Sequence, residues 1–448
     1  MKILKITLHG FLVWLLSTAA AAQNGATELS RTDDYGYYND IWGYTAPDGR
    51  EYAIIGTDNG TAFYNVTNPS APNRVAFIPG PNSIWRDMKT LGAYCYIVTE
   101  GGGGMQIVSL VNPDSPTLVS NYGASIWSHA HNIAIDTATS LAYVVGADPN
   151  PGMVVLDLAN PVAPLQLASY NTHEVHDAHI QNGLAHLAEI YDGHYRIVSV
   201  STLPAFPSLD FVTTPGNFTH NVWANATDSI AVTTDENTGG GLAFYDISNP
   251  SNIQLLSTWK NDNARVHNAF IKGNRAFMSW YSYGFACLDI SNPSQPQQIA
   301  SFDTNIATGP GFDGAWGVYP FAQSGLVYLS DQDGGLFVLR IDAPDFLLSG
   351  PTLLTVGNPA SLNISGAAAG ITWYLLRSFS NAGSQIHGTP FELGTGASLL
   401  ASGTTDLNGS ANHGILVPPR VSGLTIFVEA ATAQGTLRSS NMLRVQIQ

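Results

Sequence analysis

The chain has 448 residues, with 33 acidic and 17 basic side chains and a formal net charge of −16. Such a chain lacks the basic surface that displaces counterions from nucleic acid, so we expect no nucleic-acid partner. It is also too long for one ordinary hydrophobic core, which favours two domains or a set of repeats that share buried faces.

The first segment has the features of a cleaved signal peptide, which we place at residues 1–22. Lys2 and Lys5 precede the apolar run Ile6–Leu16, and alanines at 20–22 offer small residues for cleavage. The run is shorter than the roughly 20 apolar residues that a transmembrane helix needs, and no other stretch reaches that length. We therefore expect a secreted protein, extracellular or periplasmic, with no membrane span.

A repeat dominates the next 320 or so residues. Seven times an apolar stretch runs into a polar turn that ends in proline, from Thr61–Pro69 to Leu336–Pro344, and successive prolines lie 43 to 51 residues apart. Each copy holds several short apolar runs separated by Gly, Asn, Asp and Pro, which is typical of strands and turns. Four short strands in about 45 residues form one blade of a β-propeller. The chain is therefore predicted to be all-β, with a seven-bladed β-propeller over residues 23–345.

The last repeat is incomplete. It offers three strands, Ala315–Pro320, Leu326–Ser330 and Leu336–Ile341, and no fourth. Thr27–Arg31 has the pattern of the outer strands in the other copies, such as Leu255–Ser257. We expect this N-terminal strand to complete the last blade and to remove an exposed sheet edge.

The two cysteines fall in different repeats. Cys95 belongs to the second copy and Cys287 to the sixth. A ring of seven blades holds these copies well apart, so we interpret both cysteines as small, buried, unpaired side chains.

Residues 346–448 lack the repeat motif. Short alternating apolar segments such as Ala360–Ser365 and Leu424–Ala430 are separated by turn residues, without a cysteine pair. This pattern favours a small immunoglobulin-like β-sandwich, which we interpret as an accessory or attachment domain.

Histidines recur at one repeat position. Aligning the first strand of the seven copies brings together residues spaced 44 to 47 apart: Asn39, Arg86, His131, His176, His220, His267 and Gly314. The next position holds Asp40, Asp87, Asn132, Asp177, Asn221, Asn268 and Ala315. The first strand of a blade is innermost, so these residues are expected to line the central channel, with His129 and His179 close by.

This alignment supports two hypotheses. Because neutral imidazole is a common metal ligand, His131, His176, His220 and His267 could bind a divalent transition metal, with His129 and His179 as weaker candidates. Asp40, Asp87 or Asp177 would then orient the imidazoles. The alternative is structural, since a His-Asn pair can join neighbouring blades through hydrogen bonds to the backbone. Asn39 and Arg86 are channel-lining in either case.

The fourth repeat departs from the others. It contains the cluster His173–His179 with Glu189, which could supply a general base beside a metal or could simply be a polar wall. It also has an insert between Pro204 and Pro215, and binding specificity often lies in such loops. The sequence has no nucleophile elbow, phosphate loop or His-Glu-x-x-His motif.

Several motifs together resemble a known family. The DISNP-like turns, strand starts such as Ser128–Asp136 and Val266–Ala269, and the closing Gly311–Phe321 and Asp333–Arg340 segments are similar to the LVIVD-repeat, choice-of-anchor B family of exported bacterial proteins. The resemblance implies a propeller displayed outside the cytoplasm and joined to an attachment device, and it implies no established reaction.

Two functions follow as expectations. The first is an exported binding or scaffold module of the cell envelope or extracellular space, whose partner is a protein, a glycan or a small molecule. The second is a metal-dependent enzyme that uses the histidine cluster in the central channel.

Overall fold

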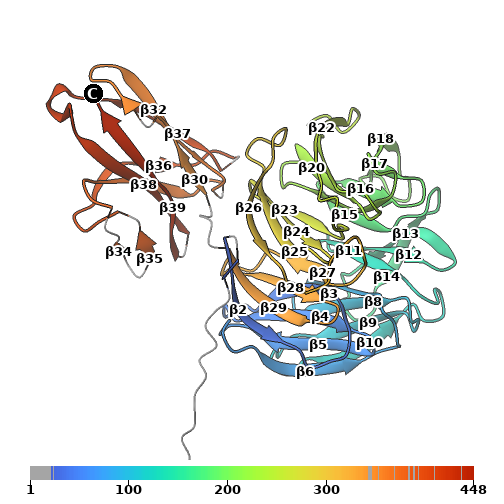
Figure 1. Ribbon diagram of the computed structural model, residues 1–448. Helices are drawn as coiled ribbons and strands as arrows, with labels where there is room; N and C mark the ends of the chain where they lie inside the picture. Colours follow the sequence, from blue (N-terminus) through green and yellow to red (C-terminus); the bar gives the residue numbers. More distant parts are fainter. Residues whose placement is uncertain are drawn as a thin grey trace, which may run out of the picture.

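The protein is all-β, as expected (Figure 1). The computed structural model describes residues 22–23, 25–341, 346–351, 353–367, 369–381, 384–386, 389–391, 393–407, 409–434 and 436–448. Within these residues the one helical element is the short 3-10 helix η1 (Pro419–Val421). The expected signal peptide lies outside the described residues, apart from Ala22.

Seven antiparallel sheets follow one another through the described part of residues 22–341. The first strands of the sheets are β3 (Tyr38–Thr45), β7 (Arg86–Leu91), β11 (Asn132–Asp136), β15 (Asp177–Gln181), β19 (Thr219–Ala224), β23 (Ala269–Lys272) and β27 (Ala315–Tyr319). The second strands are β4 (Glu51–Thr57), β8 (Tyr94–Thr99), β12 (Leu141–Ala147), β16 (Leu184–Glu189), β20 (Ile230–Asp235), β24 (Arg275–Trp280) and β28 (Val327–Asp331). The third strands are β5 (Gly60–Asn65), β9 (Met105–Ser109), β13 (Asn150–Asp157), β17 (His194–Ser199), β21 (Leu242–Asp246), β25 (Gly284–Asp289) and β29 (Gly335–Ile341).

The fourth strands lie at the outer edge of each sheet. They are β6 (Asn73–Pro79), β10 (Thr117–Tyr122), β14 (Leu165–Tyr170), β18 (Ser208–Thr213), β22 (Gln254–Trp259), β26 (Gln297–Phe302) and, in the last sheet, β2 (Ala26–Thr32). The short strand β1 (Ala22–Gln23) extends that last sheet beyond β2.

The first strands form a closed circuit. Each contacts the first strand of the next sheet, from β3 through β7, β11, β15, β19 and β23 to β27, and β27 contacts β3. Figure 1 shows the sheets arranged radially around this circuit. Sheets packed on both faces need apolar residues on both faces, which explains why all seven residues of β4 are buried whereas the outer strand β10 is mostly exposed.

The recurring turn before proline has a local cause. Asp246 and Asp289 end third strands, and each carboxylate accepts a hydrogen bond from the backbone N–H two residues later, at 2.9 Å from Ser248 and 2.8 Å from Ser291. Such Asx turns reverse the chain without help from distant residues. The repeat motif therefore encodes the reversal between the third and fourth strands.

The N-terminal strand completes the last sheet, as the sequence predicted. β2 pairs antiparallel with β29, with Thr27 opposite Arg340 and Ser30 opposite Val338. A segment from the beginning of the chain thus covers the edge of the sheet formed near residue 340, and the ring closes through backbone hydrogen bonds.

The C-terminal residues form separate sheets with their own core. One sheet contains β30 (Leu347–Ser349), β32 (Pro359–Ser365) and β37 (Ala411–Leu416). A second contains β31 (Leu353–Leu354), β39 (Thr436–Ile447), β38 (Thr425–Gln434), β33 (Thr372–Ser378) and β36 (Ser398–Thr404), and a third pairs β34 (Ser384–Ile386) with β35 (Thr389–Phe391). Leu362, Trp373 and Val428 belong to one buried cluster made of these residues alone.

Two further expectations concern the whole chain. Cys95 and Cys287 are both buried and unpaired, which confirms their interpretation as small buried side chains. In the part of the chain that the structure describes, no helix is both long enough and apolar enough to cross a bilayer.

Candidate functional site

Four of the aligned histidines lie in a row along the ring. The ring centroids of His131 and His176 are 4.1 Å apart, those of His176 and His220 are 4.2 Å apart, and those of His220 and His267 are 4.4 Å apart. The row continues to Trp316, whose ring lies 4.6 Å from that of His267. The sequence therefore located this group correctly, because one repeat position places one side chain per sheet.

Three of the four imidazoles are held by the sheet that follows them. The Nδ1 atoms of His176, His220 and His267 lie 2.9, 3.2 and 2.6 Å from the carbonyl oxygens of His220, His267 and Trp316. A carbonyl oxygen only accepts, so each Nδ1 carries the proton and donates it. The structural hypothesis thus has direct support, and the same bonds leave each Nε2 with a free electron pair.

His131, first in the row, has a different partner. Its Nδ1 lies 2.6 Å from a carboxylate oxygen of Glu100, which follows the second strand of the preceding sheet. The two sheets are again joined through an imidazole, here by a carboxylate in place of a backbone carbonyl.

The row opens into a cavity of about 540 Å³, which we call the histidine mouth. Its lining combines the four imidazoles with acidic, aromatic and amide side chains: Tyr37, Ile84, Trp85, His131, His176, His220, Glu236, His267, Tyr281, Phe312, Asp313, Trp316, Gln332 and Asp333. None of these described lining residues is Lys or Arg. The mouth therefore offers electron-pair donors and aromatic faces, and the nearby guanidinium of Arg265 lies over the ring of Phe312 at 3.7 Å.

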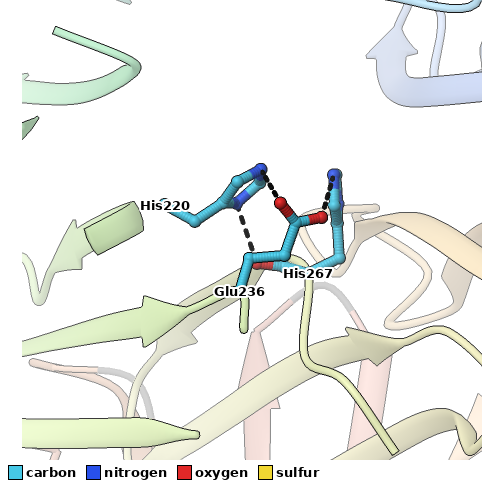
Figure 2. A group of neighbouring side chains, drawn as sticks. All are labelled: His220, Glu236 and His267. Atoms are coloured by element: carbon cyan, nitrogen blue, oxygen red, sulfur yellow. Dashed lines mark hydrogen bonds and ion pairs between the residues drawn. The ribbon is translucent and has the colours of Figure 1, made fainter. Parts of the chain in front are cut away.

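Glu236 lies between two of the imidazoles (Figure 2). Its carboxylate oxygens are 3.6 Å from Nε2 of His220 and 4.0 Å from Nε2 of His267, and one ligand atom from each residue lies within 4.8 Å of the others. The Tyr281 hydroxyl donates a hydrogen bond to Oε1 of Glu236 at 2.5 Å. The contacts with the imidazoles are too long for good hydrogen bonds, so these three groups face one another without satisfying one another.

Burial sets the protonation of this group. It lowers the pKa of His220 and lowers the pKa of His267 to about 3, so both imidazoles are neutral near pH 7. Burial also raises the pKa of Glu236 to about 7, an effect that the Tyr281 hydrogen bond opposes. Neutral imidazoles and a carboxylate that ionises near neutrality are groups suited to binding an electron acceptor.

The predicted orienting role of the aspartates is wrong. Asp87 accepts hydrogen bonds from Nζ of Lys89 at 2.6 Å and from the backbone N–H of Ile133 at 2.9 Å. Asp177 accepts from the amide of Asn221, and Asp40 from the backbone N–H of Ile41. Each aspartate follows a histidine-position residue in the strand, and successive residues point to opposite faces, so the carboxylates do not reach the imidazole Nδ1 atoms.

Two of these aspartates, Asp40 and Asp177, line a second cavity of about 460 Å³, formed by residues from the first strands. Asp40, Asp177 and Lys89 line it together with aromatic residues that include Trp42 and Trp223. Burial raises the pKa of Asp177 to about 6, which its hydrogen bond from Asn221 opposes.

The two weaker candidate histidines do not join the row. His179 lines the second cavity, where its ring stacks on Trp223 at 3.8 Å and its Nδ1 accepts the backbone N–H of Ala224 at 3.0 Å. His129 lies beside Ser128, with 3.3 Å between the hydroxyl oxygen and Nδ1. His129 lies two positions before His131 and outside β11, and His179 lies three positions after His176, on the opposite face of an extended chain, so neither prediction as a ligand is supported by position.

The remaining aligned positions are structural. Asn39 and Arg86 both donate to the carbonyl oxygen of Thr57, at 3.2 and 3.3 Å, and Arg86 also donates to Pro81. Burial lowers the pKa of Arg86 to about 10. Arg86 of β7 therefore joins the second sheet to the first, whereas the bond of Asn39 lies within the first sheet, and only Arg86 approaches the channel lining.

In the last sheet, Trp316 and not Gly314 holds the histidine position. In the first sheet, Tyr38 pairs with Thr57, and a register shift that contains Asn39 follows. In the last sheet, Ala315 pairs with Asp331, and a register shift follows in the same way. The residue after Ala315, Trp316, therefore corresponds to Asn39, and its carbonyl accepts the His267 proton. A gapless alignment could not locate this irregularity.

Sequence reasoning also missed Glu236 and Tyr281. Both directly follow second strands, β20 and β24, at the repeat position that also holds Glu100 and Gln332. Aligning the second strands as well as the first would have identified this position.

The cluster predicted in the fourth repeat brings His173 and Glu189 together with Asp192. His173 lies 2.7 Å from Asp192, and both lie within 4.8 Å of a carboxylate oxygen of Glu189. Glu189 is buried and accepts a hydrogen bond from Arg196 at 2.7 Å, so its charge is already paired. His186 lies apart from this cluster, 2.8 Å from the Tyr195 hydroxyl.

The comparisons with known proteins agree with the repeat. LVIVD repeats are found at residues 85–124, 134–172, 237–260 and 266–304. No curated protein sequence matches the chain. Among solved structures, "YCF48 bound to D1 peptide" is similar over 72% of this chain and 97% of that chain, with 12% identity and a TM-score of 0.50.

A second solved structure, a functionally unknown protein from Desulfotomaculum acetoxidans, matches 65% of this chain and 98% of its own, with 13% identity and a TM-score of 0.48. Sequence identities this low inform the fold alone. With the LVIVD repeats and the circuit of four-stranded sheets, the likeness to YCF48 identifies the fold as a β-propeller.

Proposed function

We propose that the protein is an exported, seven-bladed β-propeller that acts as a binding module and takes its ligand at the histidine mouth. In this proposal residues 1–22 are a signal peptide and residues 23–345 form the propeller. Residues 346–448 form an immunoglobulin-like accessory or attachment domain, which stands where the choice-of-anchor B proteins that the repeat resembles carry their attachment device. The circuit of seven first strands supports the blade number, and the separate C-terminal core supports the domain division.

One observation carries the proposal. At the floor of the mouth, three of the imidazoles can accept hydrogen bonds or bind a cation, but they cannot donate, because their N–H groups are already bonded to backbone carbonyls. Three imidazoles donate through Nδ1 to carbonyls and leave Nε2 free, and Glu236 lies beside two of them. A ligand must therefore bring positive charge or hydrogen-bond donors to this floor.

The rim suits a larger partner. Trp85 is 39% exposed and lines the mouth with Trp316 and Phe312, so a ligand entering the cavity can pack against aromatic faces. The similar YCF48 structure is bound to a D1 peptide, and a peptide or protein segment is the partner that we propose here.

A rim variant tests this proposal. Peptide and glycan arrays would be probed with the secreted chain, with Trp85→Ala, and with Leu255→Ala as a control on an outer strand whose side chain is 54% exposed. We expect binding signals that Trp85→Ala weakens and Leu255→Ala preserves. Signals that both variants retain would place the ligand elsewhere and contradict the proposed site.

Export has its own measurement. Expression with the native N-terminus in a bacterial host should yield a processed chain beginning at Gln23, which N-terminal sequencing identifies. An unprocessed chain retained in the cytoplasm would contradict this part of the proposal.

A metal-dependent enzyme at the same mouth is the second candidate function. The observation that favours it is the grouping of two imidazoles and one carboxylate beside an open cavity. This candidate requires a bound metal, whereas the binding module does not.

A further inference from the structure

We propose that His220, Glu236 and His267 together bind one divalent transition-metal ion, with zinc as the expected ion, at the floor of the histidine mouth. This inference rests on the proposed function, because it takes the mouth as the ligand site. It adds the kind of ion that the residues at the floor bind.

The spacing of the ligand atoms fits a shared ion. Two ligand atoms bound to one tetrahedral zinc at about 2.0–2.2 Å lie roughly 3–3.5 Å apart. Nε2 of His220 and Oε2 of Glu236 are 3.6 Å apart, Nε2 of His267 and Oε1 of Glu236 are 4.0 Å apart, and the ligand atoms of all three residues lie within 4.8 Å. The two carboxylate contacts exceed this spacing by about 0.1 Å (3.6 − 3.5) and about 0.5 Å (4.0 − 3.5), and the widest separation by at most about 1.3 Å (4.8 − 3.5), which small movements of both partners can share.

The tautomers are already those of metal ligands. Nδ1 of His220 donates to the carbonyl of His267, and Nδ1 of His267 donates to the carbonyl of Trp316. A metal-bound histidine commonly donates its other ring N–H to a backbone carbonyl or carboxylate, which orients the ring and increases the electron density on the ligating nitrogen. Both imidazoles meet this condition before any ion arrives.

The carboxylate is held in the same way. The Tyr281 hydroxyl donates to Oε1 of Glu236, leaving Oε2, the oxygen nearer His220, to bind an ion. Thr234 donates to the His267 carbonyl and so fixes the backbone that orients His220. The three ligands thus come from the ends of neighbouring strands, whose positions the sheets fix, and not from a long loop.

The donor set selects the kind of ion. Two imidazole nitrogens and one carboxylate oxygen suit zinc and other late first-row metals, whereas calcium and magnesium prefer oxygen ligands alone. Three protein ligands beside a cavity of about 540 Å³ leave a coordination position open to water or to a group of the partner. His131 lies outside this group, because its ring is three places from His267 in the row.

Cobalt titration tests the site directly. The secreted chain, produced without a polyhistidine tag and treated with a chelator, would be titrated with Co²⁺ and followed by visible absorption. We expect one Co²⁺ per chain, displaced by Zn²⁺. Glu236→Gln should weaken Co²⁺ binding by more than the roughly 10–100-fold that loss of an outer-shell partner costs. His220→Gln should do the same.

A matched control comes from the other cluster of similar composition. His173→Asn alters the His173, Glu189 and Asp192 group and should leave Co²⁺ binding unchanged. The proposal is overturned if the wild-type chain binds no Co²⁺, if Glu236→Gln and His220→Gln bind it as tightly as wild type, or if His173→Asn abolishes binding. Near-ultraviolet circular dichroism of each metal-free variant verifies that it is folded, and Glu236→Gln preserves the shape and the Tyr281 contact.

Failure of the metal site and failure of the proposed function give different results. If Co²⁺ does not bind but array signals remain sensitive to Trp85→Ala, the mouth binds a partner without a metal. If Co²⁺ binds to the three residues and no array signal depends on Trp85, the metal site stands and the partner-binding role does not.

Discussion

The imidazole Nδ1 of His220 lies 3.2 Å from the carbonyl oxygen of His267, and this contact joins two neighbouring sheets. The same relationship recurs between His176 and His220 and between His267 and Trp316. Because each bond uses only Nδ1, the structural and the ligand-binding hypotheses for the histidines are compatible. The Nδ1 atom of each ring is bonded to the backbone, and the Nε2 atom remains available to a ligand in the mouth.

The sheet-joining role predicts a loss of stability on truncation. His176→Ala removes the donor that satisfies the His220 carbonyl at 2.9 Å. We expect the free energy of unfolding to fall by about 1–3 kcal/mol, the usual result when a buried polar group loses its partner. Urea denaturation measures this effect. His129→Ala is the control, with an expected change within about 0.5 kcal/mol, and equal effects of the two variants would argue against the role.

The closure of the ring predicts a strong effect of an N-terminal deletion. Removing residues 23–33 takes away β2 and leaves β29 as an unpaired edge. Exposed edges pair with other chains, so we expect a clear fall in melting temperature or aggregation, measured by differential scanning calorimetry and size-exclusion chromatography. Unchanged melting and a monodisperse peak would mean that the pairing contributes little.

The cysteines predict a simple chemical count. Cys95 and Cys287 are buried and unpaired, and burial raises the pKa of Cys287 to about 12. Protein never exposed to reductant should therefore show two thiols per chain after unfolding and very slow reaction with a thiol reagent while folded. A count of zero without dimer formation would contradict the separation of the two sheets.

His179 predicts a specific acid sensitivity. Burial lowers its pKa to about 3 in the folded protein, whereas the unfolded side chain takes up a proton below about 6.5. With respect to this group, the free energy of unfolding keeps its full value above pH 6.5 and falls as the pH is lowered toward 3. At pH 5 it has fallen by about 2 kcal/mol, since each pH unit corresponds to about 1.4 kcal/mol.

The measurement compares wild type with His179→Gln, which keeps an acceptor for the Ala224 N–H. Between pH 7.5 and 5, the variant should lose about 2 kcal/mol less unfolding free energy than wild type. Other groups with shifted pKa values, such as Asp177 and Glu236, are common to both proteins and cancel in the comparison. Identical pH dependence would show that His179 is protonated in the folded state.

Much of the fold was predictable because its causes are local or periodic. The Asx turns at Asp246 and Asp289 lie within a few residues of the strands that they end. Sheets that stack on equivalent neighbours repeat the same pattern, so one period of about 45 residues was enough to locate the first strands. The incomplete last repeat likewise indicated that Thr27–Arg31 pairs with the end of the propeller.

The sequence by itself therefore determined the repeated β-sheets, the pairing of the N-terminal strand and the row of four histidines, since each follows from spacing along the chain. Only the tertiary structure decided what surrounds that row. Glu236 and Tyr281 follow second strands of neighbouring sheets, and Glu236 meets both His267 and Tyr281 across the boundary between those sheets. A register shift puts Trp316 in place of Gly314, and strand alternation turns Asp87 toward Lys89. The physical reason is that a period gives each residue a place in the ring, whereas its contacts depend on which way each side chain points and on its neighbours in the next sheet.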